Sequence, residues 1–327
     1  MKKKIKILLL LVLCMVLLAA CKKTAETFED ELAGEPQQEE EQVTYKFGYS
    51  CITMDNPYFI KLESSLREAV EAEGHTLITK DAESNSQLQR EQVAELIDEG
   101  IDAIFLSPVD WMEITPAIDM LNEAGVKIIN IDTQVQALDK VDAYVGSDNT
   151  NAGYLCGQDL LERLPEGGKI IIVECPNRNS INERIKGFEK AIAKNGFEVV
   201  SRIDGKGDLD VALPEVEEAL KNNPDVVAIM CGNDPMALGA LVAANTVGVN
   251  DVVIYGIDGS PEVKEEIVKE GSKIVATVAQ PIAETGKEAV SVALKIMNDE
   301  KYESVTYLET FWIDKENVAE YGADTWQ

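Results

Sequence analysis

Several polar side chains in this sequence stand where an apolar segment ends. Asp132 follows "KIINI", Asp258 follows "VVIYGI", and Asn233 and Asp234 close the segment "VVAIMCGND". Carboxylate oxygens accept hydrogen bonds, whereas a side-chain amide both donates and accepts them. A cluster of such groups suits a ligand that carries several hydroxyl groups.

Other residues that donate or accept hydrogen bonds also stand at or shortly after the end of a predicted strand. Ligands of open α/β sheets bind outside the carboxyl ends of the strands, so residues there are candidates for one site. An arginine adds a charged donor that can bind two oxygen atoms at once. The candidates are Ser50, Asn56, Ser107, Asp110, Asp132, Glu174, Arg184, Asn233, Asp234, Asp258 and Gln280.

Tyr58 and Phe59 add aromatic surface close to Asn56. Adjacent residues of a helix point in different directions, so we expect at least one of the two rings to face the ligand. An aromatic ring against the C–H face of a sugar is a suitable apolar partner for the polar groups.

Some of these residues also have a purely structural interpretation. Asp234 precedes Pro235, as an N-cap precedes a proline in the first helical turn, and that role would leave Asn233 freer to contact a ligand. Asp258 begins "DGSP", which is also typical of a turn. Arg184 falls in a helical stretch, where a solvent-exposed arginine is common. The residues alone leave these alternatives open.

The elements that would position these side chains alternate between short apolar runs and amphipathic stretches. That alternation is typical of parallel sheets covered by helices. Between residues 57 and 73, for example, Phe59, Leu62 and Leu66 recur at helical spacing. The predicted strands are 45–51, 76–80, 103–107, 127–131, 143–145, 169–174, 198–203, 226–230, 252–257 and 273–278.

The chain of 327 residues is long enough for about two domains, and it contains an internal similarity. "EGIDAIFLSPVD" is similar to "NNPDVVAIMCGND", and "AGVKIINIDTQ" is similar to "NDVVIYGIDGS". We therefore expect an α/β fold of two similar lobes, each a parallel sheet covered by helices.

The first residues predict export. Positively charged residues precede an apolar run that is shorter than the roughly 20 residues of a membrane-spanning helix. The run ends in "LAAC", which resembles the lipobox of bacterial lipoproteins and implies cleavage before Cys21 and lipid attachment to its thiol. We expect 1–20 to be a signal peptide, and 21–42, rich in acidic residues, to be a lipid-anchored tether.

Composition excludes several classes of function. The net charge of −29, without a basic cluster beyond the first residues, argues against nucleic acid as a partner. A single histidine and the absence of CxxC spacing argue against a metal site, and no enzyme motif or cofactor fingerprint is present. Four cysteines follow Cys21, and the residues allow either buried thiols or a Cys175–Cys231 disulfide.

Six motifs give a specific resemblance. "DNPYF", "NID", "NERIKGF", "GNDPMALGAL", "YGIDGSP" and "ATVAQP" occur in the order found in periplasmic sugar-binding proteins of the ribose/galactose type. These are substrate-binding proteins of ABC transporters, with the type I periplasmic binding fold. The resemblance runs from about Val43 to the C-terminal region.

The resemblance implies a three-strand hinge, with the ligand cleft between the lobes. Lobe one would comprise 43–147 and 281–309, and lobe two would comprise 148–280 and 310–327. It also implies which of the candidate residues bind the ligand. They are Asn56, Tyr58, Phe59, Asp132, Arg184, Asn233, Asp258 and Gln280.

Two departures from the family bear on the ligand. Thr133 stands where ribose binders have an arginine, and Leu209 stands where the family often has a second aromatic residue. Threonine lacks the charged, bidentate donor of arginine. These departures make ribose itself doubtful and leave another pentose, a hexose, a cyclitol or a related polyol.

We therefore expect a monomeric, non-enzymatic lipoprotein that captures a monosaccharide or polyol outside the cytoplasm and delivers it to ABC permease subunits. The alternative is a sugar-sensing protein that docks on a membrane receptor. The sequence separates neither these roles nor a cell-surface from a periplasmic location.

Overall fold

The structure is a computed structural model that describes residues 43–326. The predicted signal peptide and the whole predicted tether, 21–42, which includes Cys21, lie outside these residues. In the described part of the chain, no helix is both long enough and apolar enough to cross a bilayer. Two six-stranded sheets organise it.

The first sheet is entirely parallel, and we call the part of the chain built on it lobe one. Its strand order is β11-β5-β4-β3-β1-β2. The bounds are β1 (Lys46–Cys51), β2 (Thr76–Asp81), β3 (Ala103–Leu106), β4 (Lys127–Ile131), β5 (Ala143–Ser147) and β11 (Val305–Leu308).

Helices cover both faces of this sheet because side chains alternate along each strand. Phe105 and Ile129 pack in one core with α2 (Pro57–Ala72) and α10 (Ile282–Met297). Ile104 and Ile128 pack on the opposite face with α3 (Ser86–Asp98) and α4 (Thr115–Ala124). A short 3-10 helix, η1 (Leu138–Lys140), precedes β5.

The second sheet defines lobe two. Its order is β12-β10-β9-β8-β6-β7, parallel except for β12, which runs antiparallel to β10. The bounds are β6 (Gly168–Glu174), β7 (Phe197–Asp204), β8 (Val226–Cys231), β9 (Val253–Asp258), β10 (Ile274–Ala279) and β12 (Phe311–Asp314).

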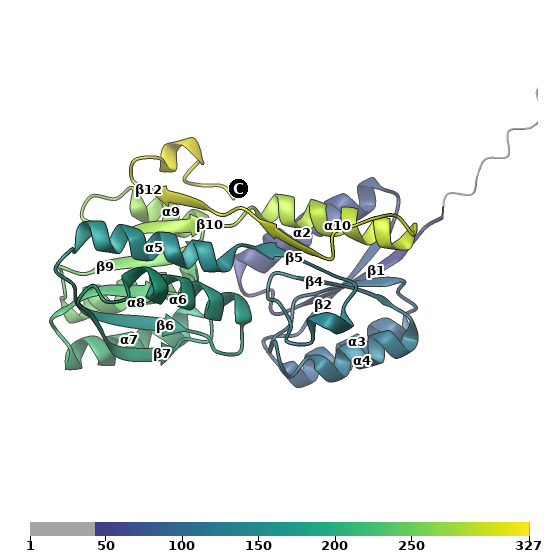
Figure 1. Cartoon of the computed structure of the whole chain (residues 1–327), viewed down its shortest axis with the longest axis horizontal. Helices are drawn as coiled ribbons and strands as arrows, with labels where there is room; N and C mark the ends of the chain where they lie inside the picture. Colours follow the sequence, from purple (N-terminus) through teal and green to yellow (C-terminus); the bar gives the residue numbers. More distant parts are fainter. Residues whose placement is uncertain (1–42, 327) are drawn as a thin grey trace, which may run out of the picture. The chain divides into compact units, whose positions relative to one another are not determined.

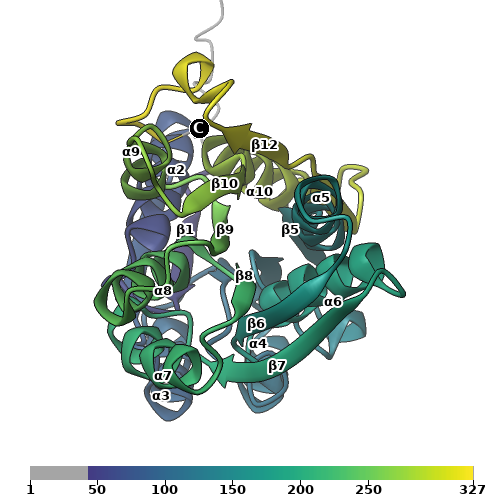
Figure 2. The same cartoon turned by 90° about the vertical axis from the view of Figure 1, so that its left-hand side faces the viewer.

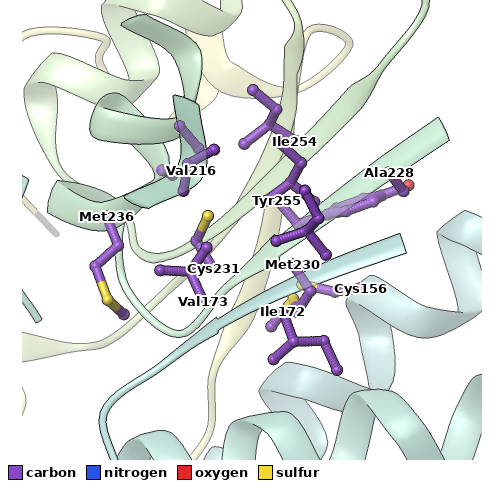
Figure 3. Packing of buried hydrophobic residues seen from close by; sticks show 14 of the residues in the cluster. Cys156, Ile172, Val173, Val216, Ala228, Met230, Cys231, Met236, Ile254 and Tyr255 are labelled. Atoms are coloured by element: carbon purple, nitrogen blue, oxygen red, sulfur yellow. The ribbon is translucent and has the colours of Figure 1, made fainter. Parts of the chain in front are cut away.

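Five helices belong to lobe two. They are α5 (Asn149–Arg163), α6 (Asn179–Ile192), α7 (Leu209–Asn222), α8 (Asp234–Val247) and α9 (Pro261–Ile267), and a 3-10 helix, η2 (Val318–Glu320), follows β12. Figure 2 looks onto this lobe, with α5 and α6 on one side of the sheet and α7 and α8 on the other. Figure 3 shows Ile172 and Met230 near Cys156 of α5, whereas Val173 lies near Met236 of α8.

The chain passes between the two sheets at three places, which Figure 1 shows side by side. It leaves the first sheet after β5 and returns between β10 and α10. It crosses again between β11 and β12, where Glu309 and Thr310 separate the two strands. The two-lobed α/β architecture predicted from the sequence is confirmed.

All ten predicted strands are present, with ends that differ by a few residues at most. The prediction missed β11 and β12. Each contains only four residues. β11 is half-buried to exposed throughout and lacks the continuous apolar run of an interior strand, and the apolar run of β12 is only three residues long.

The four cysteines of the described chain are free and buried. The structure therefore contradicts a Cys175–Cys231 disulfide. Burial raises the pKa of the Cys175 thiol to about 11 and that of the Cys51 thiol to about 12, so both remain protonated at neutral pH.

Candidate ligand-binding site

A small cavity between the two lobes brings together the eight side chains that the family resemblance implies as ligand contacts. Its volume is about 20 Å³. Its predicted lining residues are Asn56, Tyr58, Phe59, Asp132, Arg184, Asn233, Asp258 and Gln280, and Arg178, Ser180 and Ile181 complete the lining. The other strand-end candidates do not line it; they are Ser50, Ser107, Asp110, Glu174 and Asp234.

Asparagine caps place two of these residues at helix starts. The Asn56 side chain accepts a hydrogen bond from Tyr58 N at 2.9 Å, and it begins α2. This cap sets Tyr58 and Phe59 in the first turn, where both are buried and their rings pack edge to face at a centroid distance of 5.1 Å. Both rings line the cavity.

The assignment of the cap before Pro235 was wrong. Asn233 is the N-cap of α8, and its side chain accepts from Met236 N at 3.1 Å. Asp234 is instead the first residue of the helix, and its carboxylate accepts from Ser260 N and Thr277 Oγ1. Asn233 still lines the cavity, and its amide donates to Gly207 O at 3.0 Å.

Arg184 is one of the lining residues that lobe two contributes to the cavity, and it is only 3% exposed. Its Nε donates to Asn149 Oδ1 at 2.7 Å, and its Nη1 donates to Gly232 O at 2.8 Å. Nη1 also contacts Asp258 Oδ1 at 3.3 Å. The interpretation of Arg184 as a solvent-exposed residue is thereby contradicted.

A chain of hydrogen bonds continues from Arg184 to lobe one. Gln280 Nε2 donates to Asp258 Oδ1 at 2.8 Å, and Tyr58 Oη donates to Gln280 Oε1 at 3.4 Å. Gln280 precedes the return of the chain to lobe one. A ligand that replaces any of these hydrogen bonds would therefore change contacts of both lobes and of the crossing segment that follows Gln280.

Asp132 approaches the same cavity from the end of β4. Its carboxylate accepts from Thr133 Oγ1 at 3.1 Å, and Tyr144 Oη holds its backbone carbonyl at 2.8 Å. Its backbone has φ of 62°, in the left-handed region that only a minority of non-glycine residues adopt. Strained backbone of this kind is concentrated at functional sites.

Burial sets the protonation of the two aspartates. It raises the pKa of Asp258 to about 7, against the opposing effect of the Arg184 guanidinium. It also raises the pKa of Asp132, which the charges of Arg184 and Arg178 lower in turn. The cavity thus places two acidic groups against two guanidinium groups, away from water.

Arg178 and Ser180 were not predicted. Both are buried in the segment that begins α6, and Arg178 Nε has no hydrogen-bond partner among the described residues. Ser180 Oγ lies 2.8 Å from Thr133 Oγ1 across the cleft. Their position after β6 was the available signal, because the rule that selected the other candidates also applies to this loop.

A larger cavity of about 580 Å³ adjoins the small one and shares Asn56, Arg178 and Asp258 with it. Leu209 lines this outer cavity. Cavities of this size are typical of small-molecule sites. Among the described residues, no cluster of His, Cys, Asp and Glu side chains has the arrangement of a metal site.

The arrangement is chemically suited to binding a neutral, hydroxyl-rich molecule. Carboxylates accept from hydroxyl groups, guanidinium groups donate to their oxygens, and amides do both. Because the carboxylates and guanidinium groups of the cavity compensate one another's charge, the ligand need not be charged.

Comparisons with known proteins agree with this geometry. Residues 47–301 match the family described as periplasmic binding protein domain. The ribose import binding protein RbsB of Bacillus subtilis (strain 168) is 31% identical over 302 residues, which cover 92% of this chain and 95% of that protein.

Two solved structures share the fold. An ABC transporter periplasmic solute-binding protein from Actinobacillus succinogenes 130z, with bound D-allose, has a TM-score of 0.77 and 28% identity, and the match covers 85% of this chain and 100% of that one. A solute-binding protein from Bacillus halodurans C-125, with bound myo-inositol, has a TM-score of 0.78 and 28% identity, and the match covers 87% and 98%.

Proposed function

We propose, from the premise that this chain belongs to the periplasmic binding protein family of ABC transporters, that it captures a monosaccharide or related polyol and delivers it to an ABC importer. Members of this family bind solutes and are not enzymes. The observation that carries the proposal is the cavity in which acceptors and donors from both lobes lie beside two buried aromatic rings from lobe one.

The ligand class follows from the lining. Asp132 and Asp258 would accept from hydroxyl groups, Arg184 would donate to them, and Tyr58 and Phe59 would contact the C–H face of the ring. D-ribose is only one candidate, because Thr133 uses its hydroxyl on Asp132 and Ser180 and offers no guanidinium. The relatives with D-allose and myo-inositol support a wider panel.

A thermal-shift screen tests the function directly. The purified full chain is heated with D-ribose, D-allose, myo-inositol and further monosaccharides and polyols. A ligand that binds only the folded state adds about 2.7 kcal/mol of stability at a hundredfold excess over Kd. At least one compound should raise the midpoint, and a panel without any stabilising member would contradict the proposal.

The binding residues are tested on whichever sugar the screen identifies. Asp132→Ala and Asp258→Ala each remove a carboxylate acceptor when compared at pH 8, above the pKa of about 7 of Asp258, and hydrogen bonds to charged groups contribute about 1.5–3 kcal/mol. Calorimetry should show Kd weakened by roughly tenfold or more for each. Asp251→Ala, an exposed residue, is the matched control. Unchanged affinity in both folded cavity variants would exclude this site.

We also propose that the protein is anchored by lipid at Cys21, on the strength of "LAAC" and the acidic segment behind it. Changing Cys21 to alanine removes the thiol that would carry the lipid. Metabolic labelling with a fatty acid should mark the parent chain and leave the variant unlabelled. Labelling of both to the same extent would refute the lipobox interpretation.

A sensing role would use the same cavity, with a membrane receptor in place of the permease. The two roles differ in what the cell loses. A strain without this protein should fail to accumulate the radiolabelled sugar if the protein serves import, whereas normal uptake with a lost transcriptional response would indicate sensing.

A further inference from the structure

The chain after β12 leads back to the ligand cleft. Lys264 of α9, in lobe two, is completely buried, and its Nζ donates to the backbone oxygen of Thr325. A buried ammonium group requires such a partner, because its desolvation is costly. This contact ties the last described residues to lobe two.

The next residue, Trp326, contacts lobe one. Its ring packs edge to face against Tyr58, with a centroid distance of 6.4 Å and an interplanar angle of 75°. It also packs on the core that α2 and α10 share. Thr325 contacts lobe two and Trp326 contacts lobe one, so these two residues connect the lobes beside the candidate site.

Trp326 also lines the outer cavity, together with Asn56 and Asp258 of the inner one. Among the described residues that line this cavity, Trp326 is the only aromatic one. Leu209, another lining residue, provides an aliphatic side chain. The outer cavity thus has one aromatic wall, and that wall comes from the end of the described chain.

We propose that Trp326 is a ligand-contacting residue that forms the aromatic wall of the outer sugar cleft, and that Lys264 is the positioning residue that holds it there. The inference rests on the proposed sugar-binding function. Its physical basis is the same as for Tyr58 and Phe59: an indole ring offers a large apolar face for sugar C–H groups beside the polar acceptors.

The first experiment measures sugar affinity in the full chain. Wild type, Trp326→Leu, Trp326→Phe and Trp312→Phe are titrated calorimetrically with D-ribose, D-allose and myo-inositol. For each sugar that wild type binds, Trp326→Leu should weaken Kd about threefold to tenfold. Trp326→Phe should stay within about twofold because it keeps a ring. Trp312→Phe, which alters β12 away from the cavity lining, should bind like wild type.

A double-mutant cycle tests the positioning role. Lys264→Met keeps the aliphatic stem and removes the ammonium group, so it should weaken sugar binding in the wild-type background. In the Trp326→Leu background, the same change should have little further effect, because the residue it positions is gone. Losses that add independently in the two backgrounds would show that Lys264 acts only on general stability, and would overturn its positioning role.

Fluorescence gives a readout that does not depend on affinity. In Trp111→Phe/Trp312→Phe, Trp326 is the remaining tryptophan of the sequence. Saturation with a bound panel sugar should shift its emission. Wild-type affinity in Trp326→Leu together with unchanged emission would overturn the inference and leave the proposed function intact. If wild type binds no panel sugar, the proposed function fails and the inference fails with it.

Discussion

Asp258 shows how individual side chains are prepared for binding. It ends β9 with φ of 151°, and it accepts from both Arg184 and Gln280. Burial penalises its charged form, while the neighbouring guanidinium favours it. A ligand hydroxyl group that donates to this carboxylate would meet an acceptor already shielded from water, where hydrogen bonds are electrostatically stronger.

The raised pKa of Asp258 predicts a pH dependence of stability. The folded value is about 7 and the ordinary value is 3.8, so between these pH values the folded protein binds the extra proton. The contribution of Asp258 to the free energy of unfolding is therefore fully present below about pH 4 and is lost as pH rises through 7. Asp258→Asn cannot titrate, so wild type should lose stability relative to the variant over this range.

Urea unfolding of the sugar-free protein at pH 4 to 8 checks this prediction. Asp251→Asn, at an exposed position, is the matched control and should follow wild type. A stability difference between wild type and Asp258→Asn that stays constant, or that grows in favour of wild type as pH rises, would contradict the raised pKa.

At the scale of elements, the close approach of α5 and α6 positions Arg184. A Cβ atom added at Gly153 would lie 1.7 Å from Arg184 O, and one added at Gly187 would lie 2.0 Å from Thr150 O. The two helix backbones are therefore in contact where Arg184 reaches Asn149. Glycine is required at both positions by this contact, and not by the backbone conformation of either residue.

Gly187→Ala tests this packing. Alanine in a helix normally stabilises by about 1 kcal/mol relative to glycine. Here the methyl group would separate two backbones, and such overpacking typically costs about 1–3 kcal/mol. The variant should therefore unfold at lower urea concentration and should bind sugar more weakly, because Arg184 moves with α6.

The adjacent variant Lys186→Ala is the control, since its side chain is 71% exposed. It should leave both stability and binding near wild type. A Gly187→Ala protein that is as stable as the parent, or more stable, would show that α5 and α6 are further apart than described.

At the scale of the whole molecule, contacts across the cleft oppose ligand entry. Thr133 meets Ser180 across it, and Trp111 N donates to Asn177 O at 3.1 Å. The inner cavity has a volume of about 20 Å³, little more than one water molecule needs by this measure. A monosaccharide can therefore contact all of these residues at once only if the lobes separate first and close again around it.

We expect closure to accompany binding, because both lobes and the crossing segment at Gln280 contact the ligand in the proposed site. Small-angle X-ray scattering should give a smaller radius of gyration for the sugar-saturated protein than for the sugar-free protein. An unchanged radius at proven saturation would indicate a preformed cleft, with Gln280 serving only to end a strand.

Local pattern was sufficient for much of this protein. Interior parallel strands are buried on both faces, so their sequences are continuous apolar runs, and all eight of them were predicted, as were the edge strands β2 and β7. Polar residues that follow such runs lie at the carboxyl ends of the strands, and this position allowed the candidate residues to be predicted. The order of the six motifs indicated the family, and the family resemblance indicated Arg184 as a ligand contact. The helical pattern around Arg184 alone is equally compatible with a solvent-exposed arginine.

Other features were decided only by contacts between distant segments. The partners of Asp234 are Ser260 and Thr277, which lie 26 and 43 positions further along the chain, so its nearest neighbours suggested a cap instead. β11 and β12 are short and partly exposed, and they become strands only because β5 and β10 offer them hydrogen-bonding edges. Trp326 reaches the cleft because Lys264 holds the preceding residue, a juxtaposition that no local pattern encodes, since it exists only after both lobes have folded.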